Sequence, residues 1–482
     1  MLPCVVVVVS ILCLRWGSDR AAIAAAITAA LIWAAGAYLP PEFAQFGRAL
    51  VDALILEMLV AAIILPGLLF VEISERIGAP MAVGNVIQQL QLDPPKSAIV
   101  IAAGVGIMLE SLTGFGVSLL VTVPLLVSQF ERRHAIGLAL IGMSLTPWGA
   151  LSLAAHLGAE LAALPLERFA AMAWRTSGPV AFALPLLCLL FVTKPTIKDV
   201  VFAVFAGLIL SGGIGFGTWA VGVEIAGVVG GLAVIGLAVV ISTWRLGFGL
   251  FRVFLHPALG PYYGLIVAVL AQKLLLSPLA DSGIAPVVTS GRVTFSVLAS
   301  PGAALSVAIV MSLIAFRRKL LATRRTRPLL MVLWTRGRRP LASILMFMLA
   351  ARLLVEVGAI QAVADMLSGF GAYPALVSVT LLGAMSGFVT GGATAGNALF
   401  MPSAAATGEA FDATTLFAAL QHGAAGHMGM AALPVLVILL AALVDRTPQD
   451  DRTAMRIGLG LNLVYIPLLI ASGTLLMWAG VR

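Results

Sequence analysis

The stretch from Met385 to Pro402 interrupts a long apolar region with residues that do not suit a lipid-facing helix. Its eighteen residues include four glycines, two threonines and Asn397. A glycine in a helix interior costs about 1 kcal/mol relative to alanine. Backbone freed by a helix break persists at membrane depth only where protein buries it or where it lines a watery cavity. The stretch therefore predicts a broken helix or re-entrant hairpin that faces a cavity.

A second stretch of the same character, Leu109 to Ser118, lies in the first part of the chain. Thr113-Gly114 and Thr390-Gly391 are 277 positions apart (390 − 113), and each begins a segment that contains glycine. Paired interruptions in corresponding halves are typical of the internal repeats of transporters. We therefore predict two repeats, inverted relative to one another. The alternative is that both stretches are small-residue surfaces for helix packing.

The composition indicates a membrane protein. Of the 482 residues, 61% are hydrophobic and only 10% are charged, whereas soluble proteins are about a quarter charged. Because a spanning helix needs roughly 20 mainly apolar residues, the sequence predicts an all-α polytopic membrane protein with about 12–14 transmembrane helices. Each of its two repeats is expected to carry a re-entrant or broken-helix hairpin. Short spans are predicted at 2–14 and 296–316.

Basic residues concentrate between the two halves of the chain. Nine of the 29 Lys and Arg residues lie between Arg317 and Arg339, with no acidic residue among them. Between two spanning runs, such a cluster predicts a loop retained in the cytoplasm rather than a nucleic-acid-binding arm. The predicted organisation is an N-terminal half (1–316, first broken segment near 110–128), a basic cytoplasmic linker (317–340) and a C-terminal half (341–482, second broken segment near 388–407).

Ionisable residues inside spans are costly and are therefore candidates for function. Glu110 ends an apolar run directly before the first broken segment. Because desolvation favours its neutral form, we interpret Glu110 as the carrier of a coupling proton. The alternative is a carboxylate that caps the hairpin backbone. Arg352 and Glu356, spaced i,i+4, are expected to pair with each other.

Other polar residues give weaker signals. His422 and His427 follow the second broken segment, and we interpret them as hydrogen-bonded core histidines rather than as a proton relay. Glu224 is placed near a span end, and Lys273 is expected to extend to the membrane interface. The sequence shows no metal-ligand spacing, nucleophile–base set or phosphate-binding loop. We therefore predict a protein that is not an enzyme and that binds no cofactor.

Half-helix N-termini carry partial positive charge and free N–H groups, which suit a carboxylate. We expect the tips of the two broken segments to face each other near mid-membrane and to hold such a group. The expected substrate-binding residues are Thr113, Gly114, Phe115, Gly116, Thr390, Gly391, Thr394 and Asn397, with Glu110 as the proton-coupling residue and no metal ligand.

Two motifs carry a resemblance to a known family. Leu109-Glu110 followed by Gly114-Phe115-Gly116 resembles the first hairpin of the bacterial L-lactate permease family. Phe388 to Gly391 with Asn397 to Phe400 is similar to its second hairpin. The likeness runs thinly from about residue 50 to 430 and is specific at these two motifs. Where the family has Ser and Asp or Asn, and then Ser-Ser, this chain has Gly392-Ala393 and Ala395-Gly396, so several hydrogen-bond donors for a hydroxy acid are missing.

The resemblance implies a secondary active transporter of the inverted-repeat class in the bacterial inner membrane. It would import or exchange small organic monocarboxylates, such as lactate and glycolate, by proton symport. Its partners would be the organic anion, a coupling cation (the proton) and the lipid bilayer, without nucleic acid, and a homodimer stays an open alternative. A carrier for another small organic anion, such as a sulfonate, and a channel-like anion pore are the other functions that we weigh.

Overall fold

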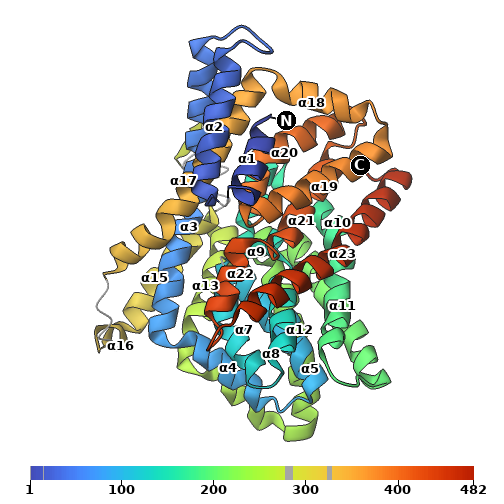
Figure 1. The fold of residues 1–482 in the computed structure, drawn as a ribbon. Coiled ribbons are helices and arrows are strands. Elements are labelled where there is room, and N and C mark those ends of the chain that lie inside the picture. Colours follow the sequence, from blue (N-terminus) through green and yellow to red (C-terminus); the bar gives the residue numbers. More distant parts are fainter. Residues whose placement is uncertain (1, 15, 115, 277–285, 323–327) are drawn as a thin grey trace.

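The computed structural model describes residues 2–14, 16–114, 116–276, 286–322 and 328–482 (Figure 1). Within these ranges the chain is an all-α polytopic membrane protein. Nine helices are long and apolar enough to cross a bilayer, or eleven if each of two bent helix pairs forms one span. This number is below the predicted 12–14 because some apolar runs form short helices. The runs at 2–14 and 296–316 form α1 (Leu2–Leu12, 11 residues) and α15 (Pro301–Ala315, 15 residues).

Two long helices, α3 (Phe43–Ile77) and α17 (Leu329–Glu356), pack antiparallel along each other. Asp52 Oδ2 lies 4.0 Å from Arg352 Nε, and Glu72 Oε2 lies 3.7 Å from Arg336 Nη1. Asp52 and Glu72 are twenty positions apart on one helix, which corresponds to about 30 Å, the thickness of the hydrocarbon core. The two ion pairs are therefore separated by about the thickness of the hydrocarbon core.

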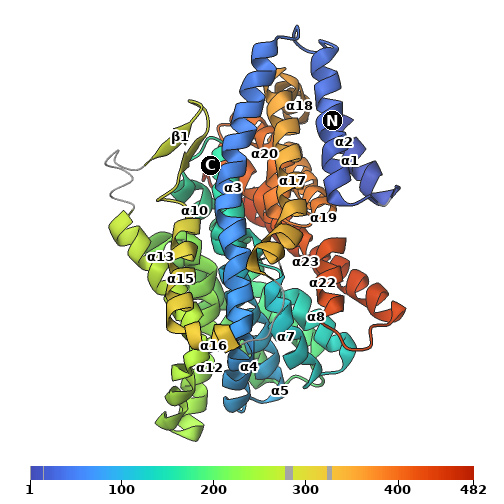
Figure 2. The same cartoon turned by 90° about the vertical axis from the view of Figure 1, so that its left-hand side faces the viewer.

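The ion pairs at the Asp52 end differ from the sequence prediction. Glu356 does not pair with Arg352 but with Arg48, at 2.8 Å, and with Arg292. Asp52, in turn, accepts a hydrogen bond from Ser290. The predicted i,i+4 pair was wrong because partners from α3 and from the segment between β1 (Val287–Thr289) and β2 (Thr294–Ser296) reach both side chains. Figure 2 shows this hairpin beside the upper half of α3 and α16 (Arg317–Ala322) beside its lower end.

The predicted basic linker is helical where it is described. It forms α16 and the first turns of α17, whereas 323–327 lie outside the described residues. The division of the chain into two halves around this linker stays a prediction.

The first broken segment belongs to a set of short helices that follows α3. This set consists of α4 (Ala79–Gln89), α5 (Pro94–Ile99), the π-helical η1 (Val100–Gly106), α6 (Ile107–Thr113), α7 (Val117–Val127), α8 (Arg132–Gly142), the 3₁₀ turn η2 (Thr146–Trp148) and α9 (Gly149–Leu161). The segments α5, η1 and α6 together form one apolar helix of 20 residues, Pro94–Thr113.

The second broken segment belongs to a matching set. After α18 (Ala359–Ser368) come α19 (Ala372–Thr390), α20 (Ala393–Glu409), α21 (Thr414–Gly429), α22 (Leu433–Ala441) and α23 (Pro448–Trp478). Both sets thus have the order helix, break, helix, loop, helix, break, helix, which is the order that the predicted repeat requires. The inverted relation between the sets stays a prediction.

The remaining elements surround these two sets. They are α2 (Ser18–Ala34), α10 (Leu166–Cys188), η3 (Leu189–Phe191), α11 (Ile197–Phe216), η4 (Gly217–Val221), η5 (Val223–Ile225), α12 (Ala226–Leu246), η6 (Phe248–Leu255), η7 (Pro257–Leu259), α13 (Gly260–Ala271) and η8 (Gln272–Leu276). Helix α10 packs against both α9 and α21, so it lies next to breaks from both halves.

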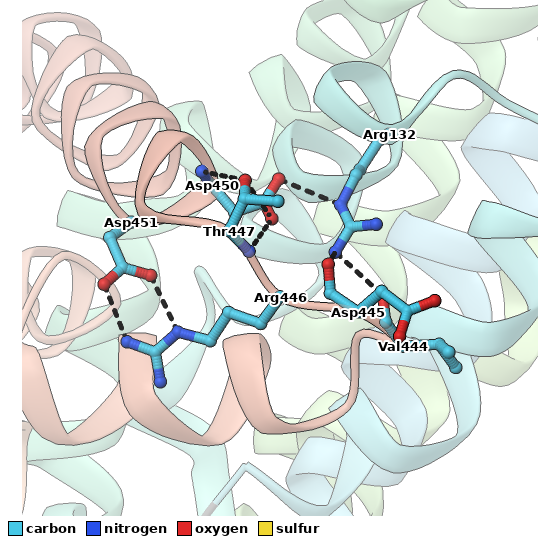
Figure 3. Close-up of polar contacts among 7 residues, drawn as sticks. All are labelled: Arg132, Val444, Asp445, Arg446, Thr447, Asp450 and Asp451. Carbon is cyan, nitrogen blue, oxygen red and sulfur yellow. Dashed lines mark hydrogen bonds and ion pairs between the residues drawn. The ribbon is translucent and has the colours of Figure 1, made fainter.

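Arg132, at the start of α8, fastens the loop between α22 and α23 (Figure 3). Its Nε donates to Asp450 Oδ1 at 2.9 Å, and its Nη2 donates to the carbonyls of Val444 and Asp445 at 2.8 and 2.9 Å. Asp450 Oδ2 accepts from the backbone N–H of Thr447 and so caps α23. One guanidinium therefore connects the two sets of broken helices through three hydrogen bonds.

Arg132→Ala is expected to lower the free energy of unfolding by about 1–3 kcal/mol, because the largely buried Asp450 carboxylate loses a charged donor. Arg446→Ala is the matched control. Arg446 pairs with Asp451 at 2.7 Å in an exposed position (Figure 3), and such pairs contribute only about 0–1 kcal/mol. Thermal unfolding in detergent measures both variants. Equal decreases in melting temperature for the two variants would show that the contacts of Arg132 stabilise the protein no more than an exposed ion pair does.

Candidate functional site

The first break separates α6 from α7 at Gly114 and Gly116. Their φ angles of +66° and +74° lie in the left-handed region, where a side chain is strained. A Cβ on Gly114 would also come within 2.5 Å of Ala150 Cβ, so the break packs against the start of α9. Phe115, predicted with these glycines as a binding residue, lies outside the described residues.

Glu110 spans this break. Its Oε2 accepts from Ser118 Oγ at 2.8 Å, and its Oε1 lies 3.4 Å from the N–H of Gly116. Both donors belong to the N-terminal turn of α7, so these contacts are those of a capping carboxylate. Glu110 is also close to the first residue of α9, because a Cβ on Gly149 would lie 3.8 Å from its Oε1. The cap uses donors of α7 and none of α9.

Thr113 and Thr390 end the helices before the two predicted breaks. Thr113 Oγ1 donates to the carbonyl of Leu109 at 2.6 Å, and Thr390 Oγ1 donates to the carbonyl of Ser386 at 2.8 Å. In this conformation both hydroxyls therefore serve the backbone of their own helices. Thr394, one turn after the second break, is half-buried in the first turn of α20.

The second break lies at Gly391 and Gly392, inside the predicted segment. Gly391 has a φ of +93° and Gly392 a φ of +157°. The N-terminus of α20 follows directly and has no side-chain cap, so its first-turn N–H groups face the break. Ala393 at this N-terminus packs with Ala154 of α9 and Ala425 of α21. Small side chains therefore surround a free helix N-terminus.

Two further breaks occur outside the two predicted broken segments. Between α8 and α9 the chain leaves helical geometry, and Ala150, Leu151 and Ser152 all have φ between +49° and +58°. Left-handed non-glycine residues cost of order 1–3 kcal/mol each and cluster at functional sites. Between α21 and α22 the helix is interrupted at 430–432.

Helix α22 contacts both predicted breaks. A Cβ on Gly391 would lie 3.2 Å from Pro434, and a Cβ on Gly116 would lie 3.2 Å from Ile438. Pro434 and Ile438 are one helical turn apart, about 6 Å along the axis. The two tips therefore contact neighbouring turns of one helix, and the expected face-to-face contact between them stays a prediction.

Asn397 connects the second break with α9. Its Nδ2 donates to the carbonyl of Ala154 at 2.8 Å and lies 3.0 Å from His422 Nδ1. Its Oδ1 is buried without a hydrogen-bond partner in the protein. Gln421 Nε2 donates to the carbonyl of Gly396 at 3.3 Å, and Gln421 Oε1 is likewise buried and unpaired. The backbone carbonyls of Ala154 and Gly396 can only accept, so each must face the NH₂ group of a side-chain amide, which fixes the orientation of both amides. The two acceptor oxygens, Asn397 Oδ1 and Gln421 Oε1, are therefore left without a donor.

A second polar group ties α21 to the α8–α9 break. His427 Nδ1 donates to the carbonyl of Ser144 at 2.6 Å, Ser144 Oγ lies 3.0 Å from Tyr465 Oη, and Thr146 Oγ1 donates to the carbonyl of Gly426. His427 Nε2 is buried and unpaired. The prediction of hydrogen-bonded core histidines fits the Nδ1 contact but leaves Nε2 unexplained.

The structure thus brings together some predicted residues and adds others. Glu110 and Gly114 lie at the start of α9, and Asn397 contacts α9 one turn later, so α9 links the two motifs. Sequence reasoning missed Gln421, Ser144 and Tyr465. A polar residue within a glycine-rich apolar helix was the available signal for Gln421, whereas Ser144 and Tyr465 gave none.

The electrostatic character of the site follows from the helix ends. The N-termini of α7, α9, α20 and α22 all lie at breaks, and each helix has at least nine residues. Each N-terminus carries about half a positive charge. Glu110 caps that of α7, and the first residues of α9 are not helical, so the N-termini of α20 and α22, which have no side-chain cap, are available to an anion. Among the described residues, no three metal-ligating side chains come together.

Comparisons with known proteins leave the family open. No protein-family model matches this chain. No curated protein matches it either.

Proposed function

We propose that this chain is a secondary active transporter of small organic monocarboxylates in a bacterial inner membrane, with 2-hydroxy acids such as lactate and glycolate as the preferred class. We propose further that proton symport drives the transport. One observation carries the proposal. The N-terminus of α20, which has no side-chain cap, lies beside two buried acceptor oxygens, Asn397 Oδ1 and Gln421 Oε1, that have no partner in the protein.

The chemistry of a 2-hydroxy acid fits this arrangement. Its carboxylate would accept hydrogen bonds from the free N–H groups at the start of α20, and Thr394 would lie beside it. Its hydroxyl group would donate to Asn397 or Gln421, which satisfies a buried acceptor that otherwise costs about 1–3 kcal/mol. The side-chain donors that the L-lactate permease family has at 392–396 are absent here, so backbone donors would hold the carboxylate. On this basis we also propose membership of that family.

Proton coupling is assigned to Glu110. Its position at the start of α9 and next to the first break would make its protonation sensitive to an anion bound at the neighbouring N-termini. A neutral Glu110 would weaken the cap of α7, which relies on charge-assisted hydrogen bonds.

An uptake screen in proteoliposomes tests the proposal. Purified protein is offered L-lactate, glycolate, propionate, acetate and ethanesulfonate, each with an inward proton gradient and without one. We expect gradient-stimulated uptake of the hydroxy acids, weaker uptake of propionate, and loss of the stimulation in Glu110→Gln. Preference for ethanesulfonate would reassign the substrate, single-channel currents would indicate a pore, and no uptake of any anion would end the proposal.

A further inference from the structure

A second group of ionisable side chains lies on α9, away from the residues that face Asn397. His156 and Glu160 follow one another at i,i+4 spacing and so share one helix face, and Ser152 lies in the break that precedes it. Ala154 and Gly158, which approach Asn397, are also spaced i,i+4. Each is two positions away from a residue of the first face, so the two lie on a different face of α9. Helix α9 therefore presents one face to the proposed substrate site and a different, ionisable face to η5 and η8.

His156 is the centre of the ionisable face. Its Nε2 lies 3.4 Å from Glu224 Oε1 of η5, and Ser152 Oγ donates to the carbonyl of the adjacent Val223 at 2.7 Å. Glu224 Oε2 is buried without a hydrogen-bond partner. A Cβ on Gly222 would lie 2.8 Å from that oxygen and 3.1 Å from Lys273 Nζ. An ammonium and an imidazole beside one carboxylate disfavour a bound metal cation but allow exchange of a proton.

Glu160 continues the face toward solvent. Its Oε2 lies 3.4 Å from the N–H of Thr294 in the β1–β2 hairpin, and it follows His156 by one turn on the same helix face. From Glu160 back to Leu153, where the left-handed residues end, is seven positions, about 10 Å. The face therefore runs from the β1–β2 hairpin to the α8–α9 break.

The other elements packed on α9 complete the charge environment of His156. Helix α3 contributes Asp52, tied to Arg352, and Glu57, and α6 contributes Glu110 at the start of α9. Helix α21 contributes His422 and His427, which contact Asn397 and Ser144 respectively. The arginines of α10, Arg168 and Arg175, are exposed.

We propose that this face of α9 is a proton path that joins solvent beside the β1–β2 hairpin to the buried carboxylate of Glu224, with His156 as the carrier between them. The inference rests on the proposed function, because it supplies the route for the symported proton. A proton from water binds the Glu160 carboxylate and moves to His156. It leaves Nε2, the ring nitrogen that lies 3.4 Å from Glu224 Oε1, and binds the Glu224 carboxylate, without any change in oxidation state. The hairpin lies on the opposite side from the basic α16 (Figure 2), so an importer would load its proton from outside.

The test separates proton-driven uptake from exchange. In proteoliposomes, His156→Gln, Glu224→Gln and Glu160→Gln are each assayed for lactate uptake driven by a proton gradient and for lactate–lactate exchange at uniform pH. We expect gradient-driven uptake to fall about 100-fold, whereas exchange stays within about twofold of the unaltered protein, because the substrate-binding face of α9 is intact. His256→Gln, at an exposed histidine of the loop before η7, is the matched control and should change neither rate.

Each outcome decides the matter. Unchanged gradient-driven uptake in His156→Gln and Glu224→Gln would overturn the path. Equal loss of exchange and of driven uptake in a variant that still shows a lactate-induced thermal shift would also overturn it, since the residues would then serve conformational change as a whole. Absence of both rates in the unaltered protein would refute the proposed function itself, which is a different result.

Discussion

Asn397→Ala is expected to reduce uptake of a 2-hydroxy acid by about 10- to 100-fold, mainly through a higher KM. Asn397 supplies a buried Oδ1 without a protein partner, next to the N-terminus of α20. Loss of one hydrogen bond to a buried polar group costs about 1–3 kcal/mol, which corresponds to this range. Initial rates in proteoliposomes over a series of lactate concentrations measure the effect.

A substrate comparison makes this prediction specific. Propionate lacks the hydroxyl group, so the substitution should penalise propionate much less than lactate. Asn462→Ala is the matched control, because Asn462 is also a buried asparagine with an unpaired Oδ1, but it lies within α23 and donates to the carbonyl of Gly458. Equal penalties for both substrates, or unchanged kinetics, would remove Asn397 from the substrate site.

Gly387→Ala is expected to destabilise the protein by about 2–3 kcal/mol or more, since overpacking of a tight interface forces backbone to move. Helices α19 and α21 approach so closely that a Cβ on Gly387 would lie 1.9 Å from the carbonyl oxygen of Ala425. The obstacle is backbone rather than a flexible side chain, so it cannot rotate away. We expect a clearly lower melting temperature in detergent and a loss of transport.

Gly212→Ala provides the control for the same substitution. A Cβ on Gly212, in the middle of α11, would meet nothing within 4 Å. Because alanine is the better helix former, this variant should be neutral or more stable by up to about 1 kcal/mol. A melting temperature for Gly387→Ala equal to that of Gly212→Ala would show that α19 and α21 do not pack as described.

The two predicted breaks could be read from sequence because glycine marks them. Gly114 and Gly391 adopt left-handed backbone conformations that disfavour a side chain, so composition and geometry agree. The break before α9 could not be read, since its left-handed residues are Ala150, Leu151 and Ser152, which ordinarily favour a helix or an extended chain. There the surrounding tertiary packing overrides local preference.

The candidate site was predicted in part. Asn397 was recognised as a polar residue in an apolar helix, but its contacts with Ala154 and His422 depend on how distant helices pack. For the same reason the i,i+4 spacing of Arg352 and Glu356 was misleading. Asp52 pairs with Arg352 and Arg48 pairs with Glu356, and both Asp52 and Arg48 lie on a helix about 300 positions earlier in the chain. Sequence spacing identifies neighbours along one helix but not the competitors on another.

The antiparallel packing of α3 and α17 limits how the protein can move. Acid–base contacts join the two helices at two points about 30 Å apart, Asp52 with Arg352 and Glu72 with Arg336. Sliding one helix past the other would break both contacts at once and would also disrupt the packing along the whole pair. Helices α3 and α17 therefore stay fixed relative to each other, and any alternating exposure of the binding site must come from movement of the interrupted helices relative to this pair.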